Sequence, residues 1–124
     1  MKLKQGSARG TSRLFDITIP LADDADPEHF RKIANDIYRR NRRPFTPRDI
    51  HGTWSASWGV DGRPHLTFSG YILKGMPLFG RRKKTVRVLG KIVKRVVNYV
   101  PLSSHSFHII SMFYGRRHYH LEYQ

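Results

Sequence analysis

The sequence has no cysteine, and it has only one acidic residue, Glu122, after residue 62. Without cysteine there is neither a disulfide framework nor a thiolate metal site, and we expect an intracellular location. No apolar run reaches the roughly 18 residues of a membrane span, and the N-terminus has no signal-peptide apolar stretch. These absences exclude a disulfide-stabilised secreted scaffold and predict a protein without a transmembrane segment.

Basic residues are abundant. Lysine and arginine number 23 against nine acidic residues, a net charge of +14. Residues 1–62 hold 11 basic and 8 acidic side chains, whereas residues 63–124 hold 12 basic and one acidic side chain. Because such a field attracts polyanions, the expected partner is nucleic acid, either RNA or single-stranded DNA. An acidic protein is an alternative partner, and a membrane surface is not favoured. The sequence does not indicate an oligomeric state.

A hairpin is the clearest structural signal. Residues 53–60 and 65–72 alternate between apolar and polar side chains, which is typical of half-buried strands. Asp61-Gly62 between them predicts a tight turn. The alternation places the following residues on the core face: Trp54, Ala56, Trp58, Val60, Leu66, Phe68 and Ile72. Tyr71 falls on the opposite, polar face.

The first part of the chain predicts a strand and a helix. Residues 1–12 read as a flexible basic arm. Residues 13–21 alternate as a strand that ends at Pro20, with Phe15 on its apolar side. Asp26 and Pro27 are a suitable N-cap and first residue for an amphipathic helix that reaches the arginines of residues 39–43.

The part after the hairpin predicts a loop, a helix and a second hairpin. Residues 74–84 read as a basic loop, and residues 89–100 follow helical spacing closed by Pro101. Residues 85–88 fit either the start of this helix or a short strand. Residues 106–114 and 118–123 alternate as two further strands. The order predicts one α+β domain over residues 13–124, a β-α-β-β-α-β ferredoxin-like core plus a C-terminal strand, with two helices on one face of an antiparallel sheet and the other face open.

Candidate nucleic-acid contacts are cations in basic clusters and an aromatic residue on the open face of the sheet. They are Arg39, Arg40, Arg42, Arg43, Arg81, Arg82, Lys83, Lys84, Arg87, Lys91, Lys94, Arg95, Arg116, Arg117 and Tyr71.

Histidines near the C-terminus suggest a different chemistry. His118 and His120 fall on one face of a strand with Glu122, and two imidazoles with a carboxylate can bind a divalent metal. His118-Tyr119-His120 is similar to the His-hydrophobic-His strand of replication and mobilisation nucleases. Those enzymes also need a tyrosine nucleophile on a helix, for which Tyr38 and Tyr99 are the only predicted helical tyrosines.

A metal-free ribonuclease is the second enzymatic reading. One of these histidines would act as general base, and Arg116 and Arg117 would stabilise the transition state. The sequence has no P-loop, dinucleotide fingerprint or nucleophile elbow. We therefore expect a non-enzymatic nucleic-acid-binding protein without a cofactor. The alternatives are the small nuclease and a protein that blocks an acidic partner, such as a viral or mobile-element factor acting on a host complex.

Overall fold

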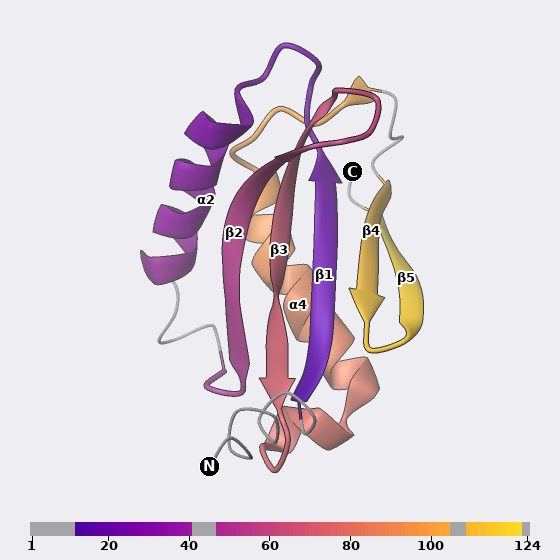
Figure 1. Cartoon of the computed structure of the whole chain (residues 1–124). Helices are drawn as coiled ribbons and strands as arrows, with labels where there is room; N and C mark the ends of the chain where they lie inside the picture. Colours follow the sequence, from indigo (N-terminus) through magenta and orange to yellow (C-terminus); the bar gives the residue numbers. More distant parts are fainter. Residues whose placement is uncertain (1–11, 41–46, 105–108, 123–124) are drawn as a thin grey trace, which may run out of the picture.

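The computed structural model describes residues 12–40, 47–104 and 109–122. Its elements are β1 (Ser12–Pro20), α2 (Pro27–Arg40), β2 (Ile50–Trp58), β3 (Pro64–Leu73), the 3-10 helix η1 (Pro77–Gly80), α4 (Arg82–Val97), β4 (Ile109–Tyr114) and β5 (Arg117–Glu122) (Figure 1). The strands form one antiparallel sheet in the order β2-β3-β1-β4-β5. This arrangement confirms the predicted ferredoxin-like α+β fold, with β5 added beside β4. The predicted arm lies outside the described residues except for Ser12, which begins β1.

The two faces of the sheet differ as the alternation predicts. On β1, Phe15 and Ile17 are buried, whereas Leu14, which precedes Phe15, is 64% exposed. Both helices cover the apolar face, to which α2 contributes Ala34 and Tyr38. The buried side of α4 consists of Thr85, Leu89, Ile92, Val93 and Val96. Figure 1 shows α4 running behind the sheet, and none of the described elements covers the front.

A pair of glycines allows close packing of two strands and of the aromatic rings in the core. Gly52 of β2 lies opposite Gly70 of β3 in the strand register. A Cβ at Gly52 would lie 2.8 Å from Cζ of Phe68, and one at Gly70 would lie 1.8 Å from the carbonyl oxygen of His51. The Phe68 ring in turn packs against Phe15, at a centroid distance of 5.3 Å. Side chains at the two glycine positions would therefore force the strands or the rings apart.

The far end of β2 departs from the prediction. Trp54 is 2% exposed and belongs to the core as predicted, but Trp58 is 62% exposed and Val60 is fully exposed. The strand ends at Trp58, and Val60 lies in the loop that joins β2 to β3. In that loop Gly62 has a φ of +78°, as the predicted turn requires. Alternation assigned the right face to Trp54, but burial also requires a covering element, and the helices do not bury the last residue of β2.

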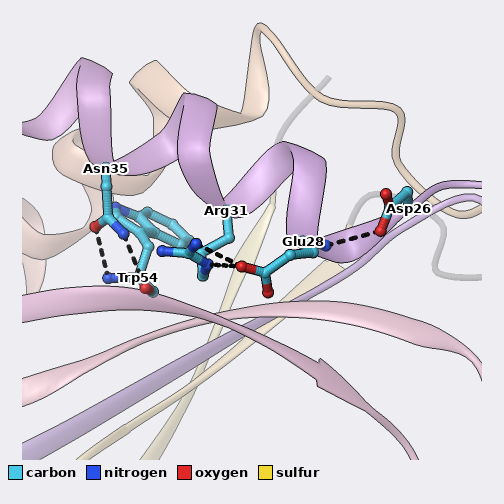
Figure 2. A network of polar contacts seen from close by, with 5 residues as sticks. All are labelled: Asp26, Glu28, Arg31, Asn35 and Trp54. Carbon is cyan, nitrogen blue, oxygen red and sulfur yellow. Dashed lines mark hydrogen bonds and ion pairs between the residues drawn. The ribbon is translucent and has the colours of Figure 1, made fainter.

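Helix α2 is tied to the free edge of the sheet by one asparagine (Figure 2). The Asn35 amide donates to the carbonyl oxygen of Trp54 and accepts from its backbone N–H, both at 3.0 Å. β2 is an edge strand, so these contacts satisfy backbone groups that no strand pairs with. The predicted N-cap is also confirmed, since Asp26 accepts from the Glu28 N–H at 3.1 Å, and Arg31 pairs with Glu28 one turn on.

Helix α4 begins earlier than predicted. Its first residue is Arg82, so residues 85–88 are helical and the short-strand alternative is wrong. The region predicted as a loop contains η1 and the first turn of α4. The hydroxyl of Thr85, which is fully buried, lies 2.7 Å from the Leu78 carbonyl oxygen and 2.9 Å from that of Arg81. The buried Asp49 carboxylate accepts from the Leu78 N–H at 2.6 Å. These contacts fix η1 and hold the start of α4 against the core.

The ends of the later elements also shift. α4 ends at Val97 instead of running to Val100. β5 begins at Arg117, one residue before the predicted position. Of the strand predicted over residues 106–114, the structure describes residues 109–114, and the remainder lies outside the described ranges.

Candidate nucleic-acid interface

Four cations form a line along the outer side of α4. Lys84, Arg87, Lys91 and Arg95 follow one another at intervals of three, four and four residues. Such intervals place side chains on one face of a helix, and all four are exposed. We call this set the cationic stripe. At 1.5 Å per residue, the eleven steps from its first to its last member span roughly 16 Å. Lys83 and Lys94 flank it and are also exposed.

The cationic stripe has little internal compensation. α4 contains no acidic residue. Within the described ranges, Lys84, Arg87 and Lys91 have no carboxylate within ion-pair distance. Within these ranges, the charges of Lys84, Arg87 and Lys91 are therefore presented to solvent and do not neutralise neighbouring acids.

The first turn of α4 places charge where the helix disfavours it. Arg82, Lys83 and Lys84 occupy that turn, which contains no acid, and the N-cap residue Arg81 makes no side-chain capping bond. The N-terminal end of a helix carries partial positive charge, so cations there are destabilising. The charges at this end thus do not serve the stability of the helix.

A groove of about 490 Å³ lies between the ends of α2 and α4. It is lined by Ile33, Ile37, Arg40, Arg95, Asn98 and Tyr99. Tyr99 is 66% exposed. The last member of the cationic stripe therefore also forms a wall of this groove.

The sequence alone did not identify this groove. The helical spacing of Ile33 and Ile37 predicts the apolar, core-facing side of α2, yet both are only partly buried. Tyr99 was considered only as a nucleophile. The signal that would have pointed to it is its position four residues after Arg95, in line with the cations.

The predicted contacts on α2 are engaged in ion pairs. Arg40 Nε lies 3.1 Å from one oxygen of Asp36, and an Arg39 nitrogen lies 3.7 Å from the other. Both arginines are in the last turn, where cations also suit the helix dipole. Arg42 and Arg43 lie outside the described residues.

The predicted aromatic contact lies on the other side of the sheet from the cationic stripe. Tyr71 is on the open face, 38% exposed, and stacks on His51 with ring centroids 5.1 Å apart. Arg116 and Arg117, both exposed, are at the turn between β4 and β5. The structure therefore does not gather the predicted contacts on one surface: Tyr71 lies on the open face, Arg116 and Arg117 at the β4–β5 turn, and the cationic stripe on the outer side of α4.

The histidine pair belongs to the open face. The rings of His118 and His120 lie 4.5 Å apart, and His118 stacks on Phe113 at 4.3 Å. The Nε2 atom of His118 lies 2.6 Å from the Ser111 hydroxyl oxygen. In the part of the chain that the structure describes, no three metal-ligating side chains gather, and this part does not include the side chain of Glu122.

The structure does not bring a helical tyrosine to this pair. Tyr38 is 7% exposed in the core. Tyr99 follows the end of α4 and lines the groove on the opposite side of the sheet. Among the described residues, neither helical tyrosine is therefore in a position to serve this histidine pair as a nucleophile.

No family model matches the sequence, and no curated protein matches it. A phage SAM lyase, solved in complex with S-methyl-5′-thioadenosine, is similar in structure over 91% of each chain, with a TM-score of 0.47 and 11% sequence identity. A likeness of this size carries no inference about activity or ligand.

Proposed function

We propose that this protein binds nucleic acid by its phosphate backbone, through the cationic stripe of α4. The observation that carries the proposal is the alignment of Lys84, Arg87, Lys91 and Arg95 along one exposed helix face that contains no acid. Regularly spaced cations match a regularly spaced polyanion, and their contacts release the counterions condensed on it. The charges supply the affinity, and phosphate contacts can position the protein along the nucleic-acid backbone without contacts to the bases.

A membrane surface fits the cationic stripe less well than nucleic acid does. A basic amphipathic helix that binds a membrane inserts its apolar face between the lipids. The apolar face of α4 is buried in the protein core, so only the charged side is available. None of the described helices is both long and apolar enough to cross a membrane. An acidic protein is the alternative partner, and the binding experiment below distinguishes it from nucleic acid.

The test is a salt series with matched charge variants. Labelled RNA and DNA, single-stranded and duplex, are titrated with the protein at several salt concentrations. The Lys84/Arg87/Lys91→Ala variant removes three stripe cations. Its control, Lys32/Arg48/Lys74→Ala, removes the same residue types from exposed positions elsewhere.

Each neutralised phosphate contributes about 0.7 to the slope of log K against log salt for single strands and about 0.9 for duplex. The stripe variant should therefore lose roughly 2 to 3 units of slope, and the control should keep the wild-type slope. Equal losses in both variants, or a slope near zero for every nucleic acid, would contradict the proposal. Binding of polyglutamate as tight as that of RNA or DNA would favour the acidic-protein alternative.

A further inference from the structure

The cationic stripe leads into the groove between α2 and α4. Arg95 belongs to both, and Tyr99 lies in the same wall four residues later. On the α2 side, Arg40 provides a second guanidinium, which is paired with Asp36. A phosphate backbone that followed the stripe would thus arrive at a hollow that two arginines line.

The lining of this groove combines three kinds of chemistry. Ile33 and Ile37 provide apolar surface, Asn98 provides an amide that both donates and accepts hydrogen bonds, and Tyr99 provides an exposed aromatic ring. Its volume of about 490 Å³ falls in the range of small-molecule sites. A nucleobase has matching features, since its faces are apolar and aromatic and its edge carries donors and acceptors. Tyrosine side chains are common stacking platforms for such bases.

We propose that the groove binds one unstacked nucleobase of a single-stranded nucleic acid whose phosphates contact the cationic stripe. This inference rests on the proposed function and narrows it to single strands. In a duplex each base is stacked and paired, so filling the groove would require flipping a nucleotide out at an energetic cost. The base that fills the groove can be of any sequence, because every base has a π-face.

The test compares two tyrosines on opposite sides of the sheet. Tyr99→Ala removes the ring from the groove, and Tyr71→Ala removes an equal ring from the open face. Affinity for a single strand and for the matching duplex is measured for both variants and for Tyr99→Phe. Tyr99→Ala should weaken single-strand binding by about 5- to 150-fold, the usual effect of losing a stacked base. Duplex affinity should not change, and Tyr99→Phe and Tyr71→Ala should bind as the wild type does.

An oligonucleotide probe gives a measurement that does not depend on folding of a variant. Wild-type protein is titrated with a single strand of abasic residues, which keeps the phosphates and removes the bases. The affinity of the wild-type protein for the abasic strand should equal the lower affinity of Tyr99→Ala for the intact strand. Equal binding of the abasic and intact strands would overturn the inference.

The outcomes separate this inference from the proposed function. If the stripe variant loses affinity and Tyr99→Ala does not, the proposal that α4 binds phosphates is supported, and the inference that the groove binds a base is wrong. If Tyr71→Ala loses single-strand affinity instead, the bases lie on the open face and the inference is wrong. If wild-type protein binds no nucleic acid, both proposals fall together.

Discussion

Removing a lysine from the first turn of α4 should make the protein more stable and a weaker binder. Lys84 lies in that turn, and Lys94 lies in the last turn of the same helix. Both are exposed. Each has a like-charged neighbour three residues away, Arg87 for Lys84 and Lys91 for Lys94. The two substitutions Lys84→Ala and Lys94→Ala therefore differ mainly in the sign of their interaction with the helix dipole.

The magnitudes follow from two terms. A cation at the wrong end of a helix costs about 0.3–1 kcal/mol at low ionic strength, and one at the right end contributes the same amount. Removing a like-charged neighbour gains about 0.2–0.5 kcal/mol at either end. Lys84→Ala should thus stabilise the protein by about 0.5–1.5 kcal/mol. Lys94→Ala should lie between about zero and 0.8 kcal/mol of destabilisation. The higher helix propensity of alanine adds a similar small gain to both and cancels in the comparison.

Thermal melting at low and high salt measures these differences. For a chain of this length a change of 1 kcal/mol moves Tm by roughly 3–5 °C, so Lys84→Ala should raise Tm by about 2–8 °C at low salt. In about 1 M salt, where the screening length is near 3 Å, most of the shift should disappear. Single-strand affinity of Lys84→Ala should fall although its Tm rises. A lower Tm for Lys84→Ala at low salt, or equal shifts of the same sign in both variants, would refute the reasoning.

Three further predictions concern the core, the sheet edge and the histidines. Trp54→Ala should cost about 3–5 kcal/mol of unfolding free energy in urea titration, because its side chain is buried. Asn35→Ala should cost about 1–3 kcal/mol in the same assay, since it leaves a backbone N–H and carbonyl of the edge strand unpaired, and retained stability would show that water replaces the amide. The wild-type protein should leave labelled RNA and DNA uncut with Mg²⁺, Mn²⁺ or EDTA; cleavage that is lost in His118/His120→Ala would instead establish the nuclease alternative.

The sequence predicted the sheet well because its signals are local. Alternation along β1 separates the buried Ile17 from the exposed Leu14, and it does so without knowledge of any other element. The N-cap at Asp26 and the turn glycine at Gly62 are equally local, since each depends on the conformation of a few residues. The order of these elements was then sufficient to predict the ferredoxin-like topology.

The errors arose where tertiary contacts decide. Residues 85–88 contain two valines, so the sequence did not decide between helix and strand. In the structure the buried Thr85 bonds to Leu78, which Asp49 in turn holds, and these contacts fix residues 85–88 as part of the helix. Trp58 has the right period for the core and is exposed because β2 ends there. The groove is formed by two helix ends about 60 residues apart in sequence, and the periodicity of a single helix does not predict that they lie side by side.

The two sides of α4 differ in composition, because one side is apolar and buried and the other is cationic and exposed. The buried side, including Leu89 and Val93, closes the core over the sheet. The outer side carries cations even in the first turn, where an acidic or capping residue would stabilise the helix. A sequence selected only for stability would place acids there, whereas a sequence that binds a polyanion would retain the cations despite their cost. The positions of Lys84 and its neighbours at the positive end of the dipole are therefore better explained by a binding surface than by a solvated helix face.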